Sequence, residues 1–133
     1  MKFGFSGEQE EFRGVMRRFL TDRSPTTEVR RLMETPDGWD RNGWRALNTG
    51  LGLTAVHIPE AHGGQGFGYS ELGIVLEEAG RALLCAPLLA TVLAASAIMN
   101  AGTAAEAAAL LPGIAAGDTV ATLAVAEDGG AWD

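Results

Sequence analysis

Cysteine is almost absent from this chain of 133 residues, because Cys85 is the only one. A single cysteine excludes an intramolecular disulfide and a cysteine-rich zinc site, and it is typical of a reducing compartment. The opening residues MKFGFSGEQEEF lack the apolar core of a signal peptide and reach acidic residues almost at once. We therefore expect a cytoplasmic protein.

Lys and Arg residues are missing from the chain after residue 81. All ten Lys and Arg residues lie at or before Arg81, and the formal net charge is −7. Nucleic-acid phosphates are bound through clustered Lys and Arg, so no nucleic-acid partner is expected. Residues 82–133 cannot supply a positively charged ligand-binding face either.

Charged residues of either sign are missing between positions 82 and 105, a stretch long enough in principle to cross a bilayer. Alanine is the commonest residue of the stretch, however, and no basic residue follows it to anchor a membrane span. It also contains Pro87, Thr91, Ser96 and Asn100. We interpret it as a buried helix of a globular protein and expect no membrane span.

What the sequence does contain is a series of helix signals, which predict a mainly α fold of five to six helices. Ser6 and Gln9 form a capping box before apolar residues that recur at helical spacing as far as Asp22. Capping residues, Pro and Gly bound the other predicted helices, over 26–33, 40–51, 70 to 83 or 84, 87–100 and 103–111. In the helix that Ser70 is expected to cap, Glu77 and Arg81 are predicted to pair.

The last residues have a different character. Residues 119–128, TVATLAVAED, are rich in β-branched side chains and precede a Gly-Gly turn signal, which predicts a β-strand. A lone strand has nothing to pair with and leaves an exposed edge. We expect that the strand begins a second, β-rich domain or that a partner supplies the sheet.

A glycine-rich loop, PEAHGGQGFGYSE at residues 59–71, lies between the apolar stretch 53–58 and a predicted helix. This order is typical of a nucleotide-binding unit, but the loop has no Lys, and Tyr69 stands where a dinucleotide fingerprint needs its third glycine. The glycines are better explained by positive φ angles or by a backbone held against a helix or a flat ligand.

Other chemically capable residues do not form a self-sufficient active site. His57 and His62 are too few to define a metal site, so we expect structural or solvated histidines and no metal. Glu77 and Glu78 are adjacent on a helix and point in different directions, which disfavours a paired acid–base role. Cys85 is expected to be a small core residue.

Three stretches together resemble the N-terminal half of an acyl-CoA dehydrogenase: FSGEQEEFRGVMRRFL, LGLTAVHIPEAHGGQGFGYSELGIVLEEAGRALL and LLPGIAAGDTVATLAVAED. The most specific part is residues 59–78. The resemblance covers essentially the whole chain. It implies an N-terminal helical domain over residues 1–117 and, over residues 118–133, the first strand of a truncated middle β-domain.

The resemblance also implies a flavoenzyme that α,β-desaturates acyl-CoA thioesters in fatty-acid, sterol side-chain or related catabolism. Such enzymes are oligomers that bind FAD between their middle and C-terminal domains and pass electrons to an electron-transfer flavoprotein. A C-terminal-domain Glu removes the α-proton while the β-hydride passes to flavin N5. No catalytic residue is therefore assigned in this sequence.

Positions that match functional positions of the family lie in two segments. Those that would line the acyl chain are Leu88, Thr91 and Ala95, and those that would contact the flavin are Val125, Ala126 and Glu127. Ala126 replaces a Thr of the family pattern, and Trp132 stands where many members have a Ser. Both replacements put FAD binding by this subunit in question.

Two further hypotheses follow. The chain could be a non-catalytic or half-site subunit of a heteromeric acyl-CoA dehydrogenase, which the replacement at Ala126 favours, or a free-standing helical interaction module. The alanines of residues 90–97 suggest a roomy pocket for a bulky or ring-bearing acyl group. By itself, the chain is expected neither to retain FAD nor to oxidise acyl-CoA.

Overall fold

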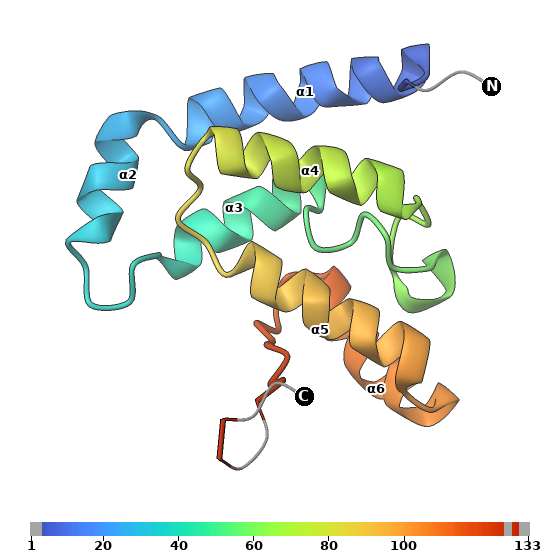
Figure 1. Cartoon of the computed structure of the whole chain (residues 1–133). Coiled ribbons are helices and arrows are strands. Elements are labelled where there is room, and N and C mark those ends of the chain that lie inside the picture. The colour runs from blue at the N-terminus through green and yellow to red at the C-terminus, as the bar shows by residue number, and fades with distance from the viewer. Residues whose placement is uncertain (1–3, 127–128, 131–133) are drawn as a thin grey trace.

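The fold was analysed in a computed structural model that describes residues 4–126 and 129–130. Six α-helices follow one another, with a short 3-10 helix, η1, between α3 and α4. Their bounds are α1 Gly7–Arg23, α2 Thr26–Met33, α3 Arg41–Leu51, η1 Glu60–His62, α4 Tyr69–Arg81, α5 Leu88–Ala101 and α6 Ala104–Ala115. In Figure 1, α1 lies along α4, and α5 lies along α6. The prediction of a mainly α fold is confirmed.

Several helix ends follow the capping signals of the sequence. The Ser6 hydroxyl accepts the Gln9 amide at 3.1 Å, and the Gln9 side chain accepts the Ser6 amide at 2.9 Å. Thr103 and Glu106 form the same reciprocal box at the start of α6. Gly52 ends α3 in the left-handed region, with φ 59°. These local hydrogen bonds satisfy backbone groups that a helix end leaves free.

Two helices differ from the prediction. α4 is capped by the Glu71 carboxylate, which accepts the Gly68 amide at 3.0 Å, so Ser70 lies inside the helix. α6 does not end at residue 111 but continues through Pro112. Pro112 lacks an amide and so removes one intrahelical hydrogen bond. Burial of Leu111 and Ile114 on either side of it favours the continued helix.

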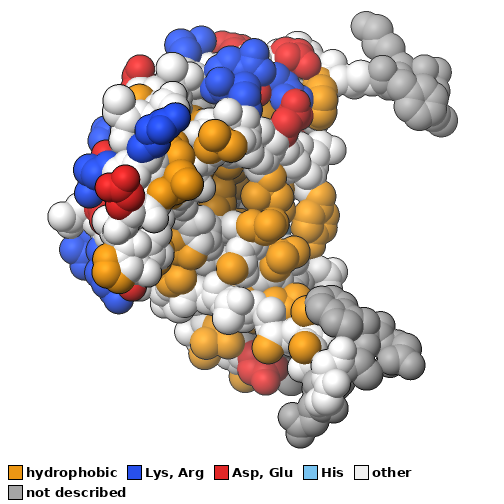
Figure 2. Space-filling view, turned by 60° about the vertical axis from the view of Figure 1, so that its left-hand side comes forward, with side chains coloured by type: hydrophobic (Ala, Val, Ile, Leu, Met, Phe, Trp, Pro, Cys, Tyr) orange, Lys and Arg blue, Asp and Glu red, His pale blue; other side chains and the backbone are white. Residues whose placement is uncertain are grey.

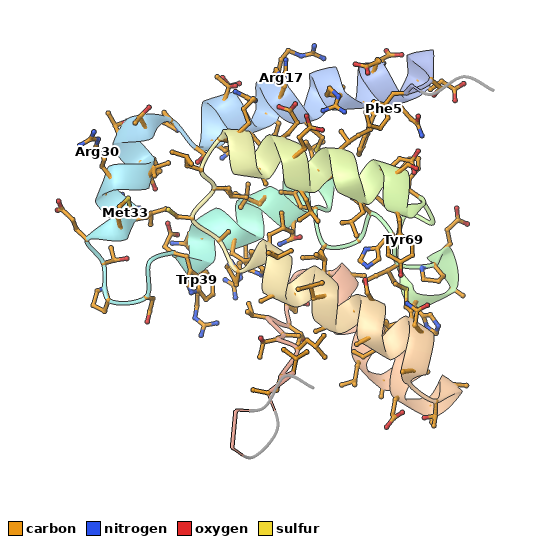
Figure 3. All side chains as sticks on the ribbon, viewed as in Figure 1. Phe5, Arg17, Arg30, Met33, Trp39 and Tyr69 are labelled. Carbon is orange, nitrogen blue, oxygen red and sulfur yellow. The ribbon has the colours of Figure 1, made fainter. Side chains whose placement is uncertain are left out.

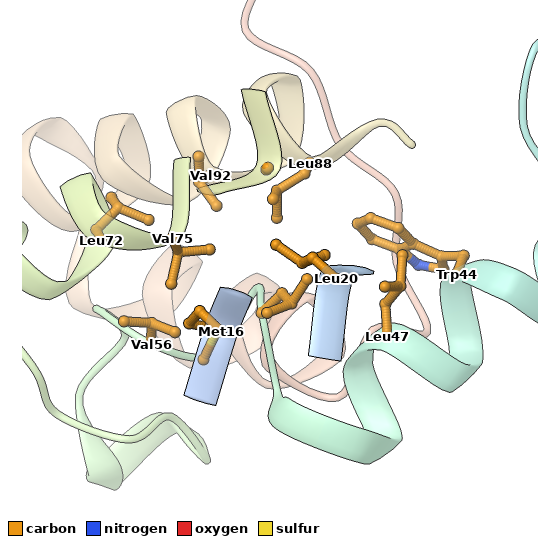
Figure 4. Packing of buried hydrophobic residues seen from close by; sticks show 11 residues of the cluster. Met16, Leu20, Trp44, Leu47, Val56, Leu72, Val75, Leu88 and Val92 are labelled. Atoms are coloured by element: carbon orange, nitrogen blue, oxygen red, sulfur yellow. The ribbon is translucent and has the colours of Figure 1, made fainter. Parts of the chain in front are cut away.

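The main core is shown in Figure 4, where apolar side chains from α1, α3, α4, α5 and the turn after α3 converge. Its buried members are Met16, Leu20, Trp44, Leu47, Leu53, Val56, Leu72, Val75, Ala79, Leu88 and Val92. A second cluster joins the same turn to α5 and α6 through Ala55, Ile58, Ala95, Leu111, Ile114 and Ala115. Residues 53–58 are thus a buried turn that contributes to both clusters.

The glycine-rich loop is held by its own backbone. The amides of Gly64, Gln65, Gly66 and Phe67 donate to carbonyls of residues 55–59 at 2.9–3.1 Å. A Cβ at Gly64 would lie 1.9 Å from the Ile58 carbonyl oxygen, and Gly66 has φ 69°. The glycines therefore serve the chain itself, and these four amides are not available to a phosphate.

A buried carboxylate joins α1 to α4. Glu78 has no exposed surface; its oxygens accept from Arg17 at 2.6 and 3.0 Å and from Arg81 at 2.6 Å. The hydrogen bond from Arg17 is the main reason why the pKa of Glu78 falls to about 2. The predicted pairing of Glu77 with Arg81 is replaced, because Arg81 binds Glu78 while Glu77 pairs with Arg13 at 2.7 Å.

After α6 the chain continues into residues 118–126, here called the exit segment. These residues belong to no helix or strand, so the strand predicted over 119–128 is not formed in its described part. Residues 127–128 lie outside the described part of the chain. A β-ladder needs a second strand, and among the described residues none is present to pair with the exit segment.

Candidate functional site

The three residues predicted to line an acyl chain all lie on α5 and are buried in the chain itself. Leu88 is 3% exposed and belongs to the main core. Ala95 is fully buried in the second cluster, against α6. Thr91 is also fully buried, and its hydroxyl faces the exit segment. The structure therefore places Thr91 and Ala95 on the inner side of α5, whereas Leu88 also lines an apolar pocket between α4 and α5. Contact of all three residues with an acyl chain stays a prediction.

The outer side of α5 carries two other leucines. Leu89 is 57% exposed and Leu93 is 46% exposed; they lie four residues apart, one helical turn, and so share a face. Sequence reasoning missed them because α5 has no charged residue and its few polar residues do not mark its outer face. The available signal was their size, since they are large side chains among alanines.

An apolar pocket of ≈ 300 Å³ lies between the end of α4 and the start of α5. Leu76, Gly80, Leu84 and Leu89 are among its lining residues, together with Leu83. Figure 2 shows a hollowed face of the molecule with hydrophobic side chains in its middle and charged side chains along its rim. The pocket has the apolar lining that small-molecule sites commonly have.

Leu83 combines two unfavourable features at the edge of this pocket. Its φ is 49°, and it ends α4 in a Schellman arrangement, with its amide bonded to Gly80 and the Leu84 amide to Ala79. Glycine is the usual residue there, and another residue costs about 1 kcal/mol. The Leu83 side chain is nevertheless 66% exposed. Within this chain, neither feature is compensated by burial.

The predicted flavin-contact positions lie at the far end of the exit segment. Val125 is 61% exposed, and Ala126 is exposed beside it. Glu127 falls outside the described residues. Neither Val125 nor Ala126 shares the pocket between α4 and α5. The structure thus gives two separate surfaces, an apolar one on α4 and α5 and an exposed backbone at the end of the exit segment.

A polar cluster on the inner side of α5 explains His57. The His57 Nε2 atom lies 3.1 Å from the Ser96 hydroxyl, and the ring is 6% exposed. Burial lowers the pKa of His57, which favours a neutral ring. Tyr69, at the start of α4, faces α5 and accepts a hydrogen bond from Asn100 at 3.0 Å (Figure 3). His57 is therefore buried and bonded through Nε2, as expected of a structural histidine, while its buried Nδ1 atom has no hydrogen-bond partner among the described residues.

Metal and membrane sites receive no support from the described residues. Within them, no three His, Cys, Asp or Glu side chains come together as a metal site would require. Cys85 is half-buried, not fully buried as a core residue would be, and its thiol lies 3.9 Å from the Val29 carbonyl oxygen. In the same part of the chain, no helix is both long and apolar enough to cross a membrane.

Comparison with known proteins gives the family. Residues 6–118, which include every helix, match the family described as "Acyl-CoA dehydrogenase, N-terminal domain". The chain belongs to the acyl-CoA dehydrogenase family. The resemblance recognised in the sequence is thereby confirmed.

Curated acyl-CoA dehydrogenases are similar to most of this chain. Acyl-CoA dehydrogenase IpdE2 of Mycolicibacterium smegmatis is 38% identical over 97 residues, which are 73% of this chain and 31% of that protein. Acyl-CoA dehydrogenase FadE28 of Mycobacterium tuberculosis is 39% identical over 89 residues, 66% of this chain and 26% of that protein. The chain thus spans about a third of the length of these relatives or less.

Solved structures of acyl-CoA dehydrogenases share the fold. The structure titled "Tcur3481-Tcur3483 steroid ACAD G363A variant" superposes with a TM-score of 0.81 at 38% identity, covering 92% of this chain and 33% of that one. The ChsE4-ChsE5 complex from Mycobacterium tuberculosis gives a TM-score of 0.77 at 28% identity, covering 97% of this chain and 33% of that one. Both titles name two components.

Proposed function

We propose that the chain is the N-terminal part of an FAD-dependent acyl-CoA dehydrogenase that α,β-desaturates acyl-CoA thioesters, and that it helps to line the acyl site. The observation that carries this proposal is the apolar pocket with the exposed Leu83 and Leu89 at its edge and Leu93 one turn further along α5. Residues 82–105 carry no charge, so this surface suits the apolar part of a thioester substrate.

The same reasoning favours a bulky acyl group. Of the alanines on α5, Ala94 and Ala95 are buried, whereas Ala90 and Ala97 are half-buried beside the outer leucines. Small side chains there leave room for a ring-bearing substrate. One solved relative is titled a steroid ACAD, which supports extending the proposal to sterol-type acyl-CoA thioesters.

FAD would be shared with parts of the enzyme that this sequence does not contain. The exposed backbone at Val125 and Ala126 would meet the flavin, and the amide of Ala126 would be the donor there, because its side chain has no hydroxyl. When bound, FAD supplies the acceptor for the β-hydride. We place the catalytic base outside this sequence and propose an electron-transfer flavoprotein as the final acceptor, in the cytoplasm.

A substitution that fills the pocket tests the acyl assignment. In the assembly that holds FAD, Leu89→Trp should raise KM for a ring-bearing acyl-CoA by roughly tenfold, because the larger side chain would occupy the substrate's space. Leu110→Trp is the matched control, since Leu110 is 46% exposed on α6 and does not line the pocket. Equal KM values for the two variants would exclude Leu89 from the acyl site.

A second candidate is a half-site subunit of a heteromeric acyl-CoA dehydrogenase. Ala126 favours it, and the two-component titles of the solved relatives agree with it. The FAD content of the purified assembly separates the two candidates. One FAD for every two chains would support the half-site subunit, and one FAD per chain would support a complete site. The 133-residue chain alone should purify without flavin absorbance in either case.

A further inference from the structure

Two buried side chains from different helices contact the backbone just before the exit segment and within it. The Trp44 indole Nε1 atom on α3 donates to the Gly117 carbonyl oxygen at 2.7 Å. The Thr91 hydroxyl on α5 lies 3.2 Å from the Ala121 carbonyl oxygen and 3.4 Å from the Ala121 amide nitrogen. Trp44 is 4% exposed and Thr91 is fully buried.

The Thr91 hydroxyl contacts the backbone of Ala121, which lies thirty residues further along the chain. One hydroxyl lies within hydrogen-bonding distance of both backbone groups of Ala121, and it also donates to the Pro87 carbonyl at 2.7 Å. A hydroxyl has one proton and two lone pairs, so it can accept the Ala121 amide while it donates to one of the two carbonyls. Ala121 also packs on the second cluster.

Beyond Ala121 the described residues of the exit segment project outwards. Leu123 is 40% exposed and Val125 is 61% exposed. Gly117, in the turn between α6 and the exit segment, has φ 76°. A Cβ at this position would lie 2.6 Å from the Asn48 side chain, so this turn packs tightly on α3. The segment is therefore fixed over its first residues, and its point of departure from the helices is set by Trp44 and Thr91.

We propose that Thr91 and Trp44 are positioning residues that aim the end of the exit segment from a fixed point beside α5. The proposal rests on the proposed function, in which that end meets the flavin. α5 carries Thr91 on its inner side and Leu89 and Leu93 on its outer side. One rigid helix thus links the surface proposed for the acyl group to the segment proposed for the flavin.

Amide hydrogen exchange of the 133-residue chain tests this anchor. Thr91→Val removes the hydroxyl and keeps the shape, so the Ala121 amide should exchange faster by roughly fivefold or more, the factor that one neutral hydrogen bond corresponds to. Thr91→Ser keeps the hydroxyl and should restore the slow exchange. Unchanged exchange of Ala121 in Thr91→Val would overturn the proposal.

Thr21→Val is the matched control. The Thr21 hydroxyl donates to the Arg17 backbone carbonyl at 2.7 Å, as the Thr91 hydroxyl does to the Pro87 carbonyl, but it accepts from the Arg81 side chain on α4 and does not contact the exit segment. In this variant the exchange rate of the Ala121 amide should equal that of the parent chain. If Thr21→Val accelerates the exchange as much as Thr91→Val does, loss of any helix hydroxyl is enough and the proposal is wrong.

If Thr91→Val does not fold, the parent chain still decides. Within the described residues, the Leu123 amide has no hydrogen-bond acceptor, so Ala121 should exchange more slowly than Leu123 after correction for intrinsic rates. Equal protection would refute the anchor. The proposed function can fail separately. Suppose that hydrogen exchange shows Ala121 to be anchored, but Thr91→Val leaves the FAD affinity of the flavin-holding assembly unchanged. The anchor would then stand, and the proposed flavin role of the exit segment would be wrong.

Discussion

Among single residues, Glu78 makes the densest set of charged contacts in the described chain. Replacing it with Gln should lower the free energy of unfolding by roughly 2 kcal/mol, the scale of hydrogen bonds to charged groups. The loss of unfolding free energy stays modest because the side chains of Arg17 and Arg81 are 52% and 42% exposed, so water can solvate them when the carboxylate is removed. Denaturant unfolding at neutral pH measures it.

The pH dependence of stability is a second test of Glu78. Its pKa is about 2 in the folded chain, against an ordinary 4.5, so its contribution is fully present above pH 4.5 and is lost as the pH falls towards 2. Glu78→Gln should remove that part of the acid destabilisation. Glu77→Gln, at an exposed partner of Arg13, is the control and should keep it.

His57 predicts a pH dependence nearer neutrality. Burial lowers the pKa of its ring below the ordinary 6.5, so the unfolded chain binds the proton more readily. The stability that the neutral ring provides is present above pH 6.5 and is lost as the pH falls below it. Unfolding experiments between pH 8 and 5.5 should show this decline, and it should become shallower in His57→Asn but persist in His62→Asn.

The elements offer a contrast between two glycines. Gly64→Ala should lower stability by roughly 2 kcal/mol or more, because overpacking displaces backbone and its new Cβ would meet the Ile58 carbonyl at 1.9 Å. Gly73→Ala on α4 meets nothing within 4 Å and should raise stability by roughly 0.5–1 kcal/mol. Thermal unfolding of both variants checks this, and a stable Gly64→Ala variant would contradict the tight loop.

How far the elements could be predicted depends on how local their causes are. Ser6 and Thr103 bond within three residues, and so their helix starts were readable from spacing. The main partner of Glu78 was not, because Arg17 approaches from a helix some sixty residues away in sequence. Arg81 binds Glu78, three residues away, and not Glu77 as predicted. The outer face of α5 was also hidden, since the helix has no charged residue and its polar Thr91 is buried, so polarity does not mark the exposed side.

The exit segment shows the same limit for the candidate site. A strand is stabilised by its partner, and β-branched composition alone cannot supply one. Thr91 was identified from the family resemblance as an acyl contact, while in the structure its hydroxyl meets Ala121 across thirty residues of sequence. The resemblance gave the position without its surroundings, which only the packing of α5 on the segment defines.

For the whole molecule, the exposed apolar face is best tested at Leu83. In the isolated chain this leucine combines a φ of 49° with a 66% exposed side chain, so Leu83→Gly should raise the free energy of unfolding by roughly 1 kcal/mol. The same variant should bind less of a hydrophobic dye and self-associate less in sedimentation experiments, because apolar surface around the pocket is lost.

Two outcomes separate the possible roles of that face. If Leu83→Gly stabilises the chain while dye binding falls, the leucine contributes nothing to the isolated fold, and its contacts lie with whatever covers the pocket. If the variant is less stable, Leu83 packs within the chain and the face is not a contact surface. Leu110→Ser on α6 is the control, since it removes an exposed leucine away from the pocket and should leave most of the dye binding in place.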